Sequence, residues 1–401
     1  MTQGYIGRTR RQVLVVVALA AVVAALLAVA VAGHNFFDLQ IYYEALRYWV
    51  HDGGELYDWI KQDSRYGFTY PPFAALIMLP MAYLPWPVVV VLSVAATVGA
   101  GALLLWWLVV PISRRMGGSR WFAFAVTLCL TAALEPLRET VDFGQINVLI
   151  LTVVAADLLR LVPVGSRWAG VGIGLATAVK LTPGLFIGYL LVTGRCRAAL
   201  VATGTATATT LLAAAVAPDA SREFWTTALW NTDRVGELDF ISNQSLQGLL
   251  ARLDPSGATA WWLALVVATL LVWAWRSRVA VAAGSEVTGL ALTGVATCLV
   301  SPVTWVHHLV WLIPALLLLV DDALRAAAGH PRRRLLLGGV AVMYVLLTSG
   351  LVWRWEYGPG GVAGFLGGNA YVWVSLALLL ALPIRRAPVA RRPPAAVAPV
   401  S

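Results

Sequence analysis

The feature that most constrains this chain is a series of apolar runs, each roughly 15 to 25 residues long, about the length of helix that crosses a bilayer core of about 30 Å. Lipid offers no hydrogen-bond partners, so such runs must satisfy their own backbone groups, as helices do. Charged residues make up 12% of the chain, about half the share usual in soluble domains. These facts exclude a soluble enzyme, a disordered protein and a nucleic-acid binder. The sequence predicts an all-α, polytopic membrane protein.

The apolar runs differ in length, and this predicts two kinds of helix. The expected full spans, about ten in number, are approximately 13–33, 86–110, 121–137, 145–161, 198–217, 259–276, 287–303, 306–321, 335–353 and 370–384. Phe73 to Leu84 is too short to span, so we expect it to enter the membrane from one side. Between Trp168 and Thr193, Lys180 and Pro183 interrupt the apolar sequence, which predicts two half-length helices meeting at a break.

The net charge of +9 is distributed in a way that predicts orientation. With the N-terminus in the cytoplasm, the alternate connections hold 20 basic and 4 acidic residues, and the outer side holds 9 basic and 16 acidic residues. This bias follows the positive-inside rule. We therefore expect a multi-pass protein of the cell membrane with both termini cytoplasmic and two long extracytoplasmic loops, 34–70 and 218–257. Residues 1–384 are interpreted as one catalytic domain and 385–401 as a disordered cytoplasmic tail.

Polar residues gather in five segments, all on the predicted outer side. In the first, Asp38 begins an amphipathic helix at the membrane surface, just after the first span. Position alone leaves two roles open for Asp38, a helix N-cap or a general base, and the two do not exclude each other. The second segment is FTYPPFAAL, in which Tyr70 precedes two prolines that force an extended backbone.

The third segment, from Leu134 to Leu151, places charged and amide side chains between two apolar spans. A charge within a span costs roughly 2.5–3.5 kcal/mol on insertion scales, so such groups persist where they pair or line a polar cavity. Pairing of Arg138 with Glu135 or Glu139 stays open as a purely structural explanation.

The last three segments bring cations and imidazoles to the same side. Lys180 lies at the break between two half-helices, where an ammonium and free backbone N–H groups suit an anion. A polar run from Thr232 to Gly248 lies in the second long loop. His307 and His308 begin another helix, and because neighbouring helical positions are about 100° apart, we expect only one of them to face a shared cavity. The five segments predict an outward-open cavity suited to an anionic, lipid-linked substrate.

Together the motifs resemble glycosyltransferase family 87. They are DLQIYYEAL from Asp38, FTYPPFAAL, EPLRETVDFGQINVLIL, GLATAVKLTPG, TDRVG, NQSLQG and SPVTWVHHLVW, and they run in order from about residue 38 to 311. The resemblance implies an actinobacterial integral-membrane mannosyltransferase of the GT-C architecture. Its donor would be polyprenyl phosphate mannose and its acceptor a mannolipid, namely a phosphatidylinositol mannoside, lipomannan or lipoarabinomannan. The bond formed would be α-(1→2), on the extracytoplasmic face.

The resemblance also implies roles for individual residues. Asp38 falls on the family's candidate base, and His307 or His308 falls on a second implicated position. A β-linked donor that yields an α-mannoside requires inversion, hence one displacement assisted by a carboxylate base. The leaving phosphate needs positive charge, and the residues expected to supply it are Lys180, Arg138 and Arg234. The residues expected to bind the acceptor or sugar are Tyr70, Glu139, Gln145, Asn147, Asn243 and Gln244.

Two further expectations concern cofactors and the competing function. The outer side has no D-x-D pair, only Glu237-Leu238-Asp239, so we expect neither a metal nor another cofactor. The alternative function is a lipid or glycolipid transporter or flippase that binds at the Lys180 break. Polar groups at one face and the lack of a visible inverted repeat favour the enzyme. Its expected partners are the donor, the acceptor and membrane lipids, with no nucleic acid.

Overall fold

The computed structural model describes residues 2–30, 33, 35–231, 236–254, 258–356 and 360–384. Within these ranges the only β contact is an isolated bridge between Ile60 and Gly67, and the regular structure is otherwise helical. The all-α prediction is therefore confirmed. Two predictions, the phosphate-binding role of Arg234 and the disordered tail at 385–401, fall outside the described residues.

The helices vary widely in length. The longest α-helices are α1 (Thr2–Ala30), α4 (Trp86–Arg115), α10 (Cys196–Val216), α13 (Ala258–Ala282) and α16 (Pro331–Ser349). Those of intermediate length are α2 (Phe37–His51), α5 (Arg120–Ala132), α7 (Asn147–Ala156), α14 (Glu286–Val300), α15 (Ile313–Arg325) and α18 (Ala370–Ala381). The short ones are α3 (Pro72–Met78), α6 (Glu135–Asp142), α8 (Val171–Val179), α9 (Leu185–Val192), α11 (Pro218–Glu223), α12 (Leu246–Ala251) and α17 (Gly361–Gly368). Short segments of 3₁₀-helix or π-helix are η1 (Leu79–Tyr83), η2 (Asp157–Leu161), η3 (Thr182–Gly184), η4 (Phe224–Ala228), η6 (Val306–Leu312) and η7 (Leu351–Trp355).

Several helices are long and apolar enough to cross a membrane. In the described chain these are five, at Thr9–Ala28, Trp86–Arg115, Cys196–Val216, Thr259–Ala282 and Val306–Arg325. The number rises to seven if each bent pair, α5 with α6 at 71° and α17 with α18 at 59°, counts as one span. The chain is thus a polytopic membrane protein. The larger count of about ten full spans stays a prediction, because segments such as α7 and α14 form helices of only 10 and 15 residues.

The two interrupted segments fold as the sequence predicts. Helix α8 ends at Val179, Lys180 adopts an extended backbone with φ −148° and ψ 126°, and a new helical turn begins at Thr182. Pro183 lies in the first turn of η3, where its missing N–H costs nothing. The apolar segment 73–84 forms α3 and η1, which together are too short to span.

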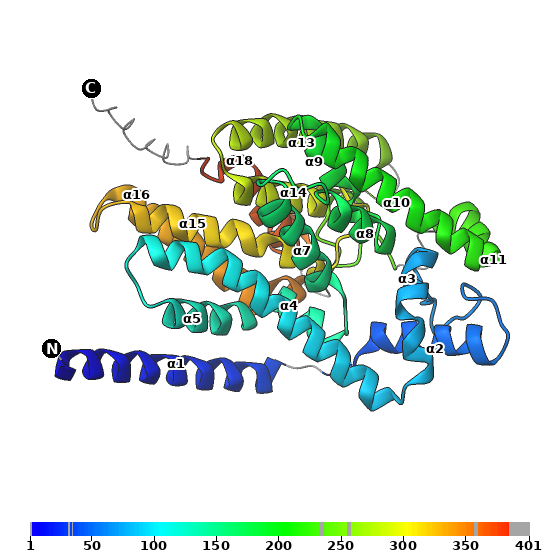
Figure 1. The fold of residues 1–401 in the computed structure, drawn as a ribbon, viewed down its shortest axis with the longest axis horizontal. Helices are drawn as coiled ribbons and strands as arrows, with labels where there is room; N and C mark the ends of the chain where they lie inside the picture. The colour runs from blue at the N-terminus through cyan, green and yellow to red at the C-terminus, as the bar shows by residue number, and fades with distance from the viewer. Residues whose placement is uncertain are drawn as a thin grey trace, which may run out of the picture.

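Most long helices lie alongside one another (Figure 1). Helices α2 and α3 gather at one end, whereas the start of α1 lies at the opposite end (Figure 1). The main core is centred on α14, which is buried continuously from Thr288 to Leu299. A second, smaller core joins α2 and α3 to the loop between them and includes Leu46, Tyr57 and Phe68.

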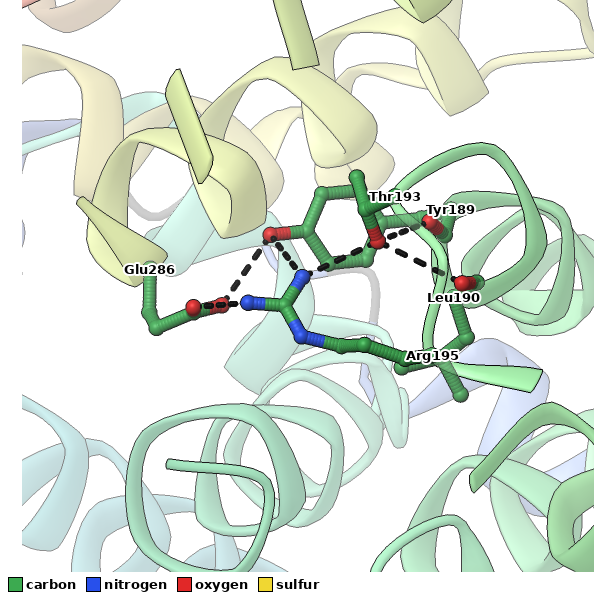
Figure 2. Close-up of polar contacts among 5 residues, drawn as sticks. All are labelled: Tyr189, Leu190, Thr193, Arg195 and Glu286. Carbon is green, nitrogen blue, oxygen red and sulfur yellow. Dashed lines mark hydrogen bonds and ion pairs between the residues drawn. The ribbon is translucent and has the colours of Figure 1, made fainter. Parts of the chain in front are cut away.

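A polar cluster far along the chain ties α9, α10 and α14 together. Figure 2 shows the Arg195 guanidinium between the Glu286 carboxylate, with which it forms an ion pair, and the side chains of Tyr189 and Thr193. The Tyr189 hydroxyl also donates to Glu286 Oε2 at 3.1 Å. Both charged side chains are less than one fifth exposed, so each charge is matched by a direct partner, as burial requires. This cluster lies in predicted cytoplasmic connections and has no part in the cavity described next.

Candidate active site

One large cavity brings the predicted polar segments together. Its volume is about 960 Å³, which is at the upper end of the range for small-molecule sites. The ionisable side chains that line it, histidines apart, are Asp38, Glu135, Arg138, Glu139, Asp142, Lys180 and Glu356, together with several tyrosines. Its aromatic lining comprises Phe37, Tyr42, Tyr66, Tyr70, Phe143, Phe224, Phe240, Trp305 and Trp353. Charged groups beside aromatic rings are suited to a ligand that has both a polar head and apolar surface.

Asp38 is positioned by the way α2 begins. The residue before the helix, Phe36, has a left-handed backbone with φ 58°, and no side chain caps this terminus. Instead, the backbone N–H of Phe36 donates to the Asp142 carbonyl at 2.8 Å, and that of Leu39 donates to the Phe143 carbonyl at 3.0 Å. The N-cap role considered for Asp38 is therefore wrong, because main-chain carbonyls of the α6–α7 turn take its place. The half-buried Asp38 carboxylate points into the cavity instead.

Gln145 connects Asp38 to two buried tyrosines. Its side-chain nitrogen donates to Asp38 Oδ2 at 2.7 Å and to the Tyr42 hydroxyl at 3.2 Å. The Tyr70 hydroxyl donates to Gln145 Oε1 at 2.6 Å. Burial raises the pKa of both Tyr42 and Tyr70 above the ordinary value, and the nearby Asp38 carboxylate adds to the increase. Both phenols therefore stay protonated, and Tyr70 is a permanent donor.

Lys180 lies at the centre of a second set of contacts. Its ammonium nitrogen is 2.8 Å from Asn147 Oδ1 and 3.0 Å from His308 Nε2, and it lies 5.4 Å from the centre of the Tyr70 ring. Asn147 also donates to the His307 carbonyl at 3.3 Å. Because its amide oxygen is taken by Lys180 and it is only 2% exposed, Asn147 acts in this structure as a support for the lysine. Its predicted contact with sugar has no direct support in the geometry.

The histidine pair differs from expectation, since both residues line the cavity. They lie in η6, and their rings are nearly perpendicular, with centroids 4.6 Å apart. His308 Nδ1 accepts the backbone N–H of Trp305 at 3.2 Å, which directs the opposite nitrogen toward Lys180. His307 lies against the Phe143 ring at 5.4 Å. The expectation that one ring would turn away is wrong, because the His308 ring lies beside Lys180 and the His307 ring lies beside Phe143, and both line the cavity.

Arg138 forms no ion pair with Glu135 or Glu139 among the residues that the structure describes. Its guanidinium donates to the Thr348 carbonyl at 2.9 Å, and the side chain lines the cavity. Glu135 instead accepts hydrogen bonds from Trp353 and Tyr371, which lie more than 200 positions later in the chain. The pairing considered from sequence is therefore not a direct ion pair, although Arg138 interacts electrostatically with both Glu135 and Glu139. Glu139 is 8% exposed and also lines the cavity.

Asn243 and Gln244 lie outside the cavity lining and are fully buried. The Asn243 amide donates to the carbonyls of Leu238 and Pro302, and its oxygen accepts the backbone N–H of Thr304 at 2.9 Å. Gln244 donates to the Ile241 and Gly368 carbonyls. Their predicted sugar contact is not supported, because their donor groups are used to hold this loop against the start of η6 and the α17–α18 junction.

The sequence interpretation missed an aromatic wall of the cavity. Phe240 lies edge-on to both Trp305 and Trp353, with ring centroids 6.0 and 5.9 Å away. Trp305 lies inside the SPVTWVHH motif, and its place there could have identified it from the sequence as a residue of the site. Trp353 carried no comparable signal. No group of three or more His, Cys, Asp or Glu side chains in the described ranges is arranged to hold a metal ion, and metal independence stays a prediction.

Known proteins resemble this chain over most of its length. The family that matches is described as "Glycosyltransferase family 87", over residues 68–302. A Mycobacterium tuberculosis protein named polyprenol-phosphate-mannose-dependent alpha-(1-2)-phosphatidylinositol mannoside mannosyltransferase is 31% identical over 87% of this chain and 85% of its own. A Mycolicibacterium smegmatis protein of the same name is 32% identical over 86% and 83%.

A further M. tuberculosis relative is named as the corresponding phosphatidylinositol pentamannoside mannosyltransferase. It is 33% identical over 74% of this chain and 69% of its own. No solved structure matches the chain. The relatives therefore bear on family and activity, whereas the geometry of the cavity comes from this structure.

Proposed function

The chain belongs to glycosyltransferase family 87, and from that premise we propose that it transfers mannose from polyprenyl phosphate mannose to a phosphatidylinositol mannoside or a related mannolipid. The new bond is α-(1→2), formed by a single inverting displacement. Residues 1–384 act as one catalytic domain that requires no metal. The names of the relatives support this donor, linkage and acceptor class.

The observation that carries the proposal is that one cavity contains a carboxylate and an ammonium, each supported by its own amide. Asp38 is held by Gln145 and Lys180 by Asn147, at 2.7 and 2.8 Å. Gln145 lies in the α6–α7 turn and Asn147 is the first residue of α7, so one short stretch of chain supports both charged groups. A base and an anion site are the two functions that an inverting transfer from a lipid phosphate needs.

The reaction follows from this arrangement. The Asp38 carboxylate accepts the proton of the attacking acceptor hydroxyl as the bond to the anomeric carbon forms. The bond from that carbon to the phosphate oxygen breaks, and the polyprenyl phosphate leaves as an anion. Lys180 stabilises the phosphate, with Arg138 and a histidine of the His307–His308 pair as further candidates. Since the leaving group is already anionic, no general acid is required.

Orientation in the membrane is part of the proposal. The charge bias assigns the cavity to the extracytoplasmic side and the termini to the cytoplasm. The position of α1's start at the opposite end from α2 and α3 (Figure 1) agrees with this assignment. A lipid-borne donor and a lipid-borne acceptor then both reach Asp38 from the outer leaflet.

The test is transfer by the purified full-length protein in lipid nanodiscs, with polyprenyl phosphate mannose and a phosphatidylinositol mannoside. We expect the acceptor to gain one hexose and polyprenyl phosphate to be released, with the linkage position and anomeric configuration read by NMR. Asp38→Asn keeps the size of the side chain, and losing a general base costs about 10²–10⁴-fold in rate. Because Asp38 does not cap α2, the thermal stability of this variant should stay close to that of the wild type.

Two outcomes would contradict the proposal. Lipid movement across the bilayer without any change of acceptor mass would indicate a flippase. Transfer by Asp38→Asn at more than about a tenth of the wild-type rate, well short of the loss expected for a base, would remove Asp38 from that role. Glu139 and Asp142, which line the same cavity, would then be tested next.

A further inference from the structure

The Gln145 amide uses nearly all of its hydrogen-bonding capacity on protein groups, which leaves little of it for a sugar. An amide has two N–H donors and one carbonyl oxygen with two lone pairs. Both N–H groups are directed at protein atoms, Asp38 Oδ2 at 2.7 Å and the Tyr42 hydroxyl at 3.2 Å. The Tyr70 hydroxyl uses one lone pair of the oxygen, at 2.6 Å. Only one lone pair remains for a substrate.

The orientation of this amide is determined by its neighbours. An ionised carboxylate only accepts hydrogen bonds, so the NH₂ end of Gln145 must face Asp38. The Tyr70 hydroxyl donates to the other end, and burial keeps Tyr70 protonated. Gln145 itself is 5% exposed, as are Tyr42 and Tyr70, and the two tyrosine rings pack with centroids 5.0 Å apart. A flipped amide would direct its oxygen at a carboxylate and its NH₂ at a hydroxyl donor.

We propose that Gln145 is a positioning residue that holds the Asp38 carboxylate in the orientation needed for proton transfer, with Tyr70 keeping the amide from flipping. The proposal rests on the proposed function, in which Asp38 is the base, and it replaces the sugar-binding role expected for Gln145 and for the Tyr70 hydroxyl. A reactive group must be held to within a fraction of an ångström by its supporting contacts. Asp38 is only half-buried, so packing alone does not provide that.

The same contact affects when Asp38 is ionised. A hydrogen bond donated to a carboxylate favours its charged form. Lys180 also favours the charged form, and Glu139 opposes it, since both interact electrostatically with Asp38. Tyr42 and Tyr70 also interact electrostatically with Asp38, and Asp142 and Arg138 line the same cavity. Removing the Gln145 donor should therefore favour the protonated, inactive carboxyl and move the acid limb of the pH–rate profile to higher pH.

The experiment compares Gln145→Leu with Gln40→Leu in nanodiscs, measuring kcat and both KM values across pH. Gln40 is a matched control, an amide on α2 like Asp38, and its partner is Lys61 at 2.8 Å. We expect Gln145→Leu to lower kcat by about 10–100-fold, as for a misplacement of about 1 Å. It should also move the acid limb of the pH–rate profile to higher pH by about one to two pH units, the worth of a hydrogen bond to a charge. Both KM values should stay close to wild type, and Gln40→Leu should behave as wild type.

A double variant separates positioning from other roles. If Gln145 acts through Asp38, adding Gln145→Leu to Asp38→Asn should change the residual rate by no more than about twofold, the usual error of additivity. A full further loss, or an unmoved acid limb with a raised acceptor KM, would overturn the proposal in favour of sugar binding. If the wild type transfers no mannose or Asp38→Asn stays active, the proposed function fails on its own measurement.

A milder variant covers the case in which Gln145→Leu does not fold. Tyr70→Phe removes one hydroxyl and keeps the ring, so it frees the amide to flip while preserving the aromatic packing. We expect a smaller fall in kcat and a smaller upward movement of the acid limb, in the same direction. A Tyr70→Phe enzyme with a wild-type pH profile and only a raised KM would overturn the proposal.

Discussion

Gly144 allows α2 to approach the α6–α7 turn closely enough to place Asp38, and Gly144→Ala should show how much this approach contributes. Gly144 has φ +69°, and a Cβ built on it would lie 2.5 Å from the Cβ of Leu39, the residue after Asp38. Ordinary contact begins at about 3.4 Å, so one backbone must move by about 0.9 Å. A leucine Cβ cannot swing aside as the end of a side chain can.

The magnitudes follow from two separate effects. The left-handed backbone costs a non-glycine residue about 1–2 kcal/mol, and overpacking at Leu39 adds about 1–3 kcal/mol. The displacement moves the start of α2, where Phe36 and Leu39 donate to the turn. Since an error of about 1 Å in a reacting group costs about 10²-fold, we expect kcat to fall by about that factor.

The control is Gly53→Ala. Gly53 has nearly the same backbone, φ +70°, but no atom within 4 Å of the added Cβ. It therefore bears the left-handed strain without the overlap and should lower the melting temperature while leaving kcat close to wild type. Both variants are compared by thermal unfolding in detergent and by mannose transfer in nanodiscs. If Gly144→Ala transfers mannose as fast as Gly53→Ala, close packing at Leu39 does not position the base.

Two further predictions concern the anion site and the orientation. Lys180→Ala should raise the donor KM by about 10–100-fold, the worth of a charged hydrogen bond. Lys180→Arg should not restore the donor KM, because a planar guanidinium cannot replace an ammonium that fits between Asn147 and His308. Unchanged donor kinetics in the alanine variant would show that the lysine is structural. In a cysteine-free background, cysteines at exposed Asp58 and Arg334 should differ in intact cells, with only the first labelled by an impermeant thiol reagent, and the reverse pattern would invert the proposed orientation.

Much of the architecture could be predicted because lipid imposes a local rule. Each apolar run must satisfy its own backbone as a helix, so helices and their breaks can be located from short stretches of sequence. The interruption at Lys180 and the short helix from Pro72 are examples, and both form as expected. The number of full spans could not be predicted in this way, because bends such as that between α5 and α6 depend on neighbouring helices.

The partners of the polar side chains could not be predicted in this way. Gln145 and Asp38 are 107 positions apart, and Glu135 and Tyr371 are 236 apart. The periodicity of a helix determines which residues share a face, but it does not determine which other helix that face meets. Asn243, for example, was expected to bind sugar, whereas its side chain donates to the carbonyls of Leu238 and Pro302.

By itself, the sequence determined a helical membrane protein. It also predicted a charge difference between the two sides of the membrane and the residue types suited to a lipid-phosphate donor. Only the tertiary structure decided that Gln145 and Asn147 hydrogen-bond to Asp38 and Lys180. The physical reason is that hydropathy is a property of each segment, whereas a hydrogen bond between side chains depends on the packing of several segments to within a few tenths of an ångström.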